Sequence, residues 1–317
     1  MKRNTGLDLL RCLLMCGIVV EHIVTKAGYV CYGAHHLVNW CVCGFVFMSG
    51  CYGLRFKLSK VLSLAVLGIW CAFVANVLAF RDVCIASAMQ RSRAFWFLWA
   101  YIVLMCFAPF LDAAFENRSR KEIVRLAMPM VLLLWGWNFV VAVPVVRDYV
   151  PRPLGFGSCT FLSLVGCYVM ARVYFLLGLG RFFTLRSAVI ALPFVIVLML
   201  CGLWYYWWIP AFFVSAFAFE LFSRMSFPMA TWLAPSVFSV YLLHMSKGGL
   251  ALMTRFEQFI HVDCNVPLWL CFVATAIATY AVCIGVDLLR RAALHPFKGV
   301  LGRMMKKLDE KFEGVRI

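Results

Sequence analysis

Ten mainly apolar runs follow one another along the chain, each roughly the 17 to 25 residues that a helix needs to cross a membrane. Short polar or aromatic segments separate them, and only YYWW at 205–208 divides the seventh run from the eighth. The pattern predicts an all-α integral membrane protein, a bundle of about ten transmembrane helices. The approximate limits of the runs are 7–27, 34–54, 59–80, 95–113, 123–146, 158–178, 187–204, 207–223, 235–254 and 267–288.

Lys and Arg are distributed unequally between the loops on the two sides of this bundle. If the N-terminus lies in the cytoplasm, the inside loops and the tail hold most of the basic residues outside the runs. Because basic loops stay cytoplasmic, both termini are predicted to be inside. We expect residues 1–290 to form the transmembrane domain and residues 291–317 a basic cytoplasmic tail. The tail has helical spacing, which fits either a helix on the anionic inner leaflet or a solvated basic helix.

Composition excludes a soluble protein. The chain has 317 residues, of which 64% are hydrophobic and 14% charged, and its mean hydropathy is +0.90. A soluble domain is nearer half apolar and a quarter charged. The net charge of +16 follows from the loops and the tail, so we expect membrane lipids as partners and no nucleic acid.

The 15 cysteines do not predict a metal site. Most of them lie inside apolar runs, where cysteine is typical of a small buried hydrophobe. Cys12 and Cys16 are one helical turn apart, but no His or further Cys pair completes a ligand set. We therefore expect no metal cofactor.

The first run carries ionisable residues that are costly at membrane depth: Asp8, Arg11, Glu21 and His22. Arg11 and His22 are eleven residues apart, which places them on one helix face, about 16 Å apart along the axis. Asp8 joins this face one turn before Arg11. Glu21 is rotated about 100° from His22 and is predicted to lie off this face. The face therefore presents a fixed cation near the cytoplasm and a titratable imidazole nearer the outside.

Each of these residues has a structural and a functional interpretation. His22 is either a histidine bonded to a neighbouring helix or a general base, because its pKa near working pH suits proton transfer from a hydroxyl. Arg11 needs an anionic partner, which is either Asp8 at i,i+3 or a bound carbonyl, thioester or phosphate. Glu21 could pair with Lys26 at the outer interface.

The segment after the second run is basic, with Arg55, Lys57 and Lys60. It is an orientation signal or a docking site for a phosphate-rich cytosolic ligand. Just before it, Ser49 and Gly50 favour close helix packing, since no base lies next to Ser49 in the sequence to make it a nucleophile.

Three further residues complete the candidate substrate-binding set. Tyr241 and His244 in SVYLLHM lie at i,i+3 on one face, where packing is the structural alternative. His36 is placed where the second run begins, at the outer face. The sequence has no glycine-rich phosphate loop, so ATP-driven transport is not expected.

Four segments resemble membrane acyltransferase family 3, and they occur in the family's order. RNTGLDLLRCLLMCGIVVEHI is similar to its first helix, with the Arg, ten residues, His spacing at Arg11 and His22. FVFMSGCYG resembles its Phe-Phe-x-x-Ser-Gly segment. FWFLWAYIVLMCFAPFLD is similar to its fourth helix, and SVFSVYLLHM resembles its Ser-Tyr-x-x-Tyr-Leu-x-His segment. The resemblance covers residues 3 to about 246.

The resemblance implies a multi-pass protein of the cell inner membrane with ten transmembrane helices. It implies transfer of an acyl group from a cytosolic acyl-CoA, usually acetyl-CoA, to a hydroxyl on an extracytoplasmic or lipid-linked glycan. His22 would be the catalytic base and Arg11 would orient the donor, with Asp8 beside it. Two departures stand out: the Arg-x-x-Arg motif after the second helix is reduced to Arg55-Phe-Lys-Leu-Ser-Lys60, and the late Ser-Tyr-Gly is Val-Phe-Ser.

Two alternatives remain open. A transporter or flippase for a lipid-linked sugar or small anion would fit the composition, although such proteins often contain internal repeats and broken helices that the sequence does not clearly show. A member of the other membrane-bound O-acyltransferase family would also use a membrane histidine, but the Arg11–His22 spacing argues against it.

Overall fold

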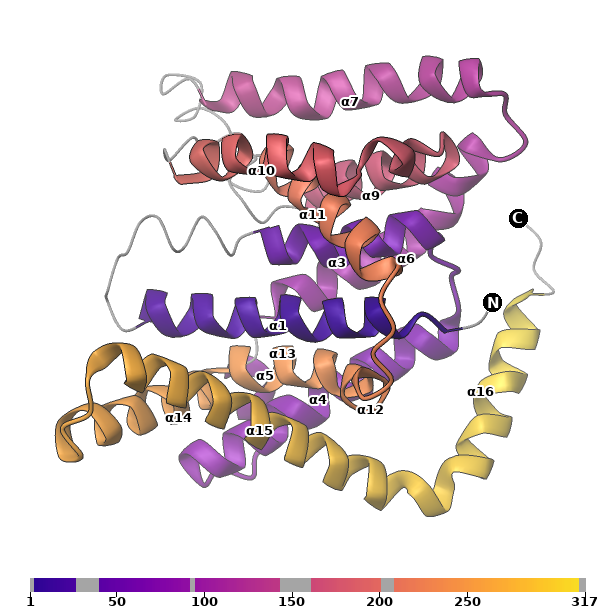
Figure 1. Cartoon of the computed structure of the whole chain (residues 1–317). Coiled ribbons are helices and arrows are strands. Elements are labelled where there is room, and N and C mark those ends of the chain that lie inside the picture. The colour runs from indigo at the N-terminus through magenta and orange to yellow at the C-terminus, as the bar shows by residue number, and fades with distance from the viewer. Residues whose placement is uncertain (1–2, 27–39, 92–94, 143–160, 201–207, 314–317) are drawn as a thin grey trace. The chain divides into compact units, whose positions relative to one another are not determined.

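The computed structural model describes residues 3–26, 40–91, 95–142, 161–200 and 208–313. Every regular element in these ranges is a helix, which confirms the all-α prediction for the described part of the chain (Figure 1). His36 and the ends of several predicted runs lie outside the described residues.

The chain divides into two compact units, each made of two separate segments. Unit 1 contains Met1–Arg55 and Val103–Trp232, and unit 2 contains Phe56–Ile102 and Leu233–Ile317. The helix α6 (Trp96–Phe115) begins in unit 2 and continues into unit 1. The other helices of unit 1 are α1 (Thr5–Lys26), α3 (Trp40–Tyr52), α7 (Arg120–Ala142), α9 (Phe161–Leu176), η1 (Leu179–Phe182), α10 (Leu185–Leu200), α11 (Trp208–Ser223) and α12 (Ala230–Leu233).

Helix α3 is the centre of unit 1 and contacts α1, α9 and α11. Its Phe47 is fully buried, with ring centroids 5.1 to 5.7 Å from those of Phe212, Tyr174 and Phe219. Such edge-to-face aromatic packing favours a fixed arrangement of the three helices. Gly50 lets α9 approach, because a Cβ at this position would lie 2.5 Å from the Tyr168 carbonyl oxygen. The predicted role of the small residues in helix packing is therefore confirmed at Gly50.

Unit 2 is organised around α13 (Val237–Met245), which contacts α4 (Leu58–Phe80), α14 (Lys247–Gln258) and α15 (Leu268–Leu294). All nine residues of α13 except Phe238 are buried. The remaining elements are α5 (Ile85–Arg91), η3 (Ala234–Ser236), a π-helical turn η4 (Phe259–Asp263), η5 (His295–Phe297) and α16 (Lys298–Glu313). At η5 the chain changes direction, so α16 points away from the axis of α15 (Figure 1).

The run predicted as one helix at 235–254 is broken in the structure. Ser246 has φ −65° and ψ 151°, an extended conformation that ends α13 and begins α14. Its hydroxyl donates to the Leu243 carbonyl at 2.7 Å and accepts from the Gly249 amide at 2.9 Å. Ser246 is therefore an N-cap, and its side chain supplies hydrogen bonds that the broken backbone lacks.

Three helices of the described residues are long and apolar enough to cross a membrane: Leu58–Phe80, Trp96–Phe115 and the helical run that begins at Leu268. Four shorter apolar helices are Trp40–Tyr52, Phe161–Leu176, Leu185–Val197 and Pro210–Ser223. Large apolar side chains such as Leu133 and Ile190 are more than 70% exposed. Water would disfavour this surface, whereas hydrocarbon would not, so these helices mark a membrane protein.

Candidate active site on the first helix

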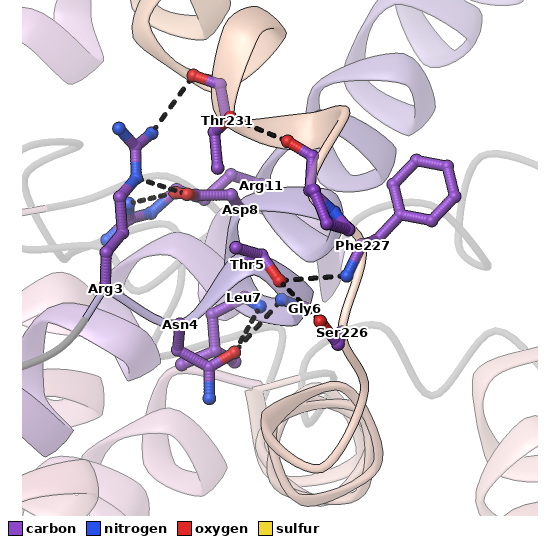
Figure 2. A network of polar contacts seen from close by, with 11 residues as sticks. Arg3, Asn4, Thr5, Gly6, Leu7, Asp8, Arg11, Ser226, Phe227 and Thr231 are labelled. Carbon is purple, nitrogen blue, oxygen red and sulfur yellow. Dashed lines mark hydrogen bonds and ion pairs between the residues drawn. The ribbon is translucent and has the colours of Figure 1, made fainter.

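The beginning of α1 is fixed by hydrogen bonds to the segment that follows α11 (Figure 2). Asn4 caps the helix: its Oδ1 accepts from the amides of Gly6 and Leu7 at 3.0 and 3.1 Å. The Asn4 amide nitrogen donates to the Ser223 carbonyl at 2.7 Å. Thr5 Oγ1 accepts a hydrogen bond from the backbone amide of Phe227, in the same segment, at 2.8 Å. These contacts fix the position and rotation of the first turns of α1, and thus of the charged residues on them.

Asp8 is 1% exposed and lies between two guanidinium groups (Figure 2). Arg3 Nε lies 2.5 Å from Asp8 Oδ2, and Arg11 Nη1 lies 3.1 Å from Asp8 Oδ1. The predicted i,i+3 pair of Asp8 and Arg11 is present in the structure. The Arg11 side chain is 44% exposed, so Asp8 leaves part of its guanidinium accessible. One carboxylate and two guanidiniums carry a net charge of +1, which suits an anionic ligand.

The face of α1 that runs from Asp8 to His22 is directed inward. Met15 and Ile18, which lie between them on this face, are 3% and 7% exposed, whereas Leu13 on the opposite side is 49% exposed. α1 is a single uninterrupted helix through both positions. The predicted stripe therefore faces the protein interior except at Arg11, whose side chain is 44% exposed.

Glu21 contacts His22, contrary to the prediction that it lies off this face. Glu21 Oε2 is 3.1 Å from His22 Nε2, and both side chains are less than one-fifth exposed. The prediction was wrong because it considered only the 100° between the two Cα–Cβ directions. The long Glu side chain bends across that angle and reaches the ring. The side chain of Lys26, the other suggested partner, lies outside the described residues.

Unit 1 also contains Ser49 and Arg55. The Ser49 hydroxyl donates to the Phe45 carbonyl one turn earlier, at 3.0 Å. This is the usual back-bond of a serine within a helix and fits the packing interpretation. Arg55 follows α3 and is exposed.

A charged cluster at the end of α3 was missed by the sequence reasoning. Arg172 Nε lies 3.2 Å from Asp112 Oδ1, and the Tyr168 hydroxyl donates to the same carboxylate at 2.9 Å. The Tyr168 oxygen also accepts from the Leu54 amide at 3.0 Å. The cluster holds the turn at Gly53, whose φ is +73°. Arg172 within an apolar run was the available signal, because a charge there needs a partner.

In unit 2, the basic segment that contains Lys57 and Lys60 lies against the tail. The backbone amide and hydroxyl of Ser59 donate to the two carboxylate oxygens of Asp309 at 3.0 and 2.7 Å. Asp309 therefore supplies an anion at the N-terminus of α4, where unpaired amides favour negative charge.

Tyr241 and His244 lie on one face of α13, as predicted, with ring centroids 6.2 Å apart. The Tyr241 hydroxyl accepts from the Phe97 amide at 3.2 Å, and His244 Nδ1 lies 2.6 Å from the Val240 carbonyl oxygen. Both side chains are at most 4% exposed. The bond from the Phe97 amide joins α13 to the start of α6, whereas the His244 contact lies within α13.

A second missed cluster fixes α13 to α15. Asp287 is 1% exposed, and its carboxylate lies 2.8 Å from Arg290 and 3.0 Å from Arg291. The Ser239 hydroxyl donates to the same carboxylate at 2.7 Å. A buried carboxylate with this many partners fixes the rotation of α13, and with it the directions of Tyr241 and His244. Within the described ranges no group of three or more His, Cys, Asp or Glu side chains is arranged to hold a metal ion.

Comparison with known proteins identifies one family. A family model described as an acyltransferase domain matches residues 4–288. The match agrees with the resemblance found in the motifs, and it contains both α1 and α13. No curated protein and no solved structure matches the chain.

Proposed function

The chain belongs to membrane acyltransferase family 3, and from this membership we propose that it transfers an acetyl group from cytosolic acetyl-CoA to a hydroxyl of an extracytoplasmic or lipid-linked glycan. The observation that carries the proposal is one face of α1, which holds the partly exposed Arg11 guanidinium beside Asp8 and the His22 imidazole beside Glu21. A reaction between a cytosolic thioester and an outer hydroxyl needs one group that orients the thioester donor and one group that acts as a base. Both must lie along the path that joins the two substrates.

His22 acts as the base in this mechanism. Glu21 holds the ring through Nε2 and stabilises the imidazolium, so Nδ1 takes the proton of the acceptor hydroxyl. The hydroxyl oxygen then attacks the thioester carbonyl and forms a C–O bond. When the tetrahedral intermediate collapses, the C–S bond breaks, and the CoA thiolate takes the proton back from the imidazolium.

Arg11 orients the donor. Its guanidinium, with five N–H donors, has capacity beyond the one bond to Asp8 and can bind a phosphate of the donor. Arg55, Lys57 and Lys60 contribute positive charge for the CoA phosphates. Ser49, Tyr241, His244 and His36 complete the proposed substrate-binding set, and no metal takes part.

The proposal includes a topology. Ten helices cross the cell inner membrane, both termini are cytoplasmic, residues 1–290 form the catalytic domain, and residues 291–317 form the tail. The support is the basic bias of the inside loops and the apolar surface of the described helices.

The decisive experiment measures CoA release and acceptor acetylation by membranes that contain each variant at equal abundance. We expect His22→Ala to abolish both, Glu21→Gln to lower kcat about tenfold or more by loosening the ring, and Arg11→Lys to lose most activity because lysine lacks the guanidinium fork. His261→Ala is the matched control, because His261 bonds only locally, to the Val266 carbonyl, in the described structure. Full activity of His22→Ala would disprove the mechanism.

The break at Ser246 favours one alternative, since transporters often place their sites at interrupted helices. A transporter or flippase would accumulate substrate without His22-dependent CoA release. The same membranes therefore distinguish the two functions. Mass spectrometry of surface glycans, with and without the protein, would identify the acyl group and its carrier.

A further inference from the structure

Unit 2 contains an apolar pocket whose wall includes the broken helix. Its volume is about 290 Å³, and α4, α13, α14 and α15 line it. Each helix contributes lining residues, for example Ala75 from α4, Leu243 from α13, Met253 from α14 and Ala278 from α15. Almost all of the lining is apolar, with His244 and Thr279 as exceptions. An apolar cavity of about 150 Å³ stays dry and binds one benzene ring, so this pocket suits a hydrocarbon about twice that size.

The break at Ser246 lies between His244 and Gly249, two residues that line this pocket. Non-helical backbone at membrane depth is tolerated where it is buried or lines a cavity. Ser246 turns α14 away from the direction of α13, and Gly248 lets α14 lie directly on α4, because a Cβ there would be 2.2 Å from the Ala75 carbonyl oxygen. Gly249, in the first turn of α14, lines the pocket itself. The interruption therefore has a structural purpose beyond ending α13.

The pocket opens onto apolar surface. Leu78 on α4, Phe256 on α14 and Val282 on α15 line it and are also 53%, 38% and 59% exposed. In a membrane such side chains contact lipid chains. A chain can therefore enter the pocket from the bilayer without crossing a polar barrier.

A guanidinium lies at the end of the wall formed by α4 and α14. Arg255 precedes Phe256, and its Nη1 donates to the Ala79 carbonyl at 3.1 Å, one residue beyond Leu78. That bond uses one of five donors. Nearby on the same end of α4, Asp82 is paired with Arg91 at 3.0 Å, and Arg81 is exposed. Basic residues thus exceed acidic ones at this rim, which favours a phosphate group.

We propose that this pocket binds one hydrocarbon chain of an anionic bilayer lipid, with the lipid phosphate held by Arg255. The site shares His244 with the substrate-binding set proposed above, but its test does not depend on acyl transfer. The proposal also assigns a second role to the wall that contains His244. The side of α13 that faces the pocket would bind lipid and so be covered by lipid rather than by water.

The test measures lipid retention by the full-length protein with native mass spectrometry, using added phosphatidylglycerol or phosphatidylcholine. We expect wild type to retain phosphatidylglycerol preferentially. Ala278→Trp should fill the pocket and reduce retention about tenfold, the loss of roughly 1.4 kcal/mol of binding free energy. Ile277→Trp is the matched control, because Ile277 is adjacent, 66% exposed and outside the pocket.

Arg255→Gln should remove the preference for phosphatidylglycerol while leaving chain binding, whereas Lys247→Gln at the other end of α14 should keep the preference. This pair tests the site even if Ala278→Trp fails to fold. Equal retention by Ala278→Trp and Ile277→Trp, both folded, would overturn the proposal. Equal retention of the two lipids by wild type would overturn the role of Arg255.

Discussion

The burial of the Asp8 carboxylate leads to an unusual prediction: removing its charge should destabilise the protein less than removing both of its arginine partners. Asp8 is 1% exposed, whereas the side chains of its partners Arg3 and Arg11 are 53% and 44% exposed. Removing both partners leaves a buried charge with neither guanidinium, which costs about 3–5 kcal/mol. Removing the charge by Asp8→Asn leaves two guanidiniums that water can still reach. That change loses charge-assisted hydrogen bonds worth about 1–2 kcal/mol net.

Three variants therefore have a definite order of stability. Asp8→Asn should be moderately destabilised and the double variant Arg3→Gln/Arg11→Gln strongly destabilised. The triple variant should recover to about the level of Asp8→Asn, because no buried charge remains to be compensated. At roughly 2 °C per kcal/mol, Tm should fall by about 2–4 °C for Asp8→Asn and about 6–10 °C for the double variant.

The assay is thermal unfolding in detergent with a thiol-reactive fluorophore. Cys43, Cys51 and Cys71 are at most 1% exposed, so they react only when the protein opens. Arg224→Gln is the control: its pair with Glu220 is exposed on the arginine side and should be worth less than about 1 kcal/mol. The reasoning is refuted if Asp8→Asn is the least stable variant, or if the triple variant is less stable than the double.

Three other predictions concern the surface, the packing of α3 and the tail. Hydrogen bonds from backbone N–H groups, of which that of Ser87 has the largest effect, lower the pKa of the exposed Cys84 thiol below its ordinary value. More thiolate is then present near neutral pH, so an impermeant maleimide should label Cys84 on intact cells, at a rate that falls as pH drops through the lowered pKa. Gly50→Ala should lower Tm by about 2–6 °C, because overpacking costs about 1–3 kcal/mol. Gly136→Ala, with no atom within 4 Å of its Cβ, should leave Tm unchanged or raise it. Asp309→Asn should increase hydrogen exchange in α16, whereas Glu310→Gln, on an exposed pair with Lys306, should not.

Contrary results have specific meanings. Peptide mapping compares wild type with Cys84→Ser, and labelling only after permeabilisation would place residues 81–84 in the cytoplasm. Equal Tm values for the two glycine variants would contradict the close approach of α3 and α9. Unchanged exchange in Asp309→Asn would show that the bonds to Ser59 do not hold the tail.

Short-range periodicity could predict some contacts and not others. Asp8 and Arg11 are one turn apart on one helix, so their pairing follows from helix geometry alone. The contact between Glu21 and His22 depends on how a long side chain bends, which helix angles do not specify. Asp112 and Arg172 come from different helices, and no local pattern pairs them.

Hydropathy alone does not indicate the break at Ser246. The run 235–254 remains apolar on both sides of the break, so counting apolar residues gives one helix. Serine is a favoured N-cap residue, but this signal concerns capping rather than hydrophobicity. Asp287 falls at the end of the run 267–288, and no local pattern indicates its partner Ser239, which lies 48 residues away.

The discontinuity of unit 2 determines when its contacts can form during synthesis. Chains emerge from the ribosome N-terminus first, so α4 is made before the whole Val103–Trp232 stretch of unit 1 and before α13, α14 and α15. The hydrogen bonds between Ser59 and Asp309 can form only after Asp309, 250 residues later in the chain, has been made. Until then α4 lacks its final neighbours. A nascent α4 therefore depends on lipid or on the insertion machinery to cover it. A chain truncated after unit 1 would leave this helix permanently without the partners that complete its fold.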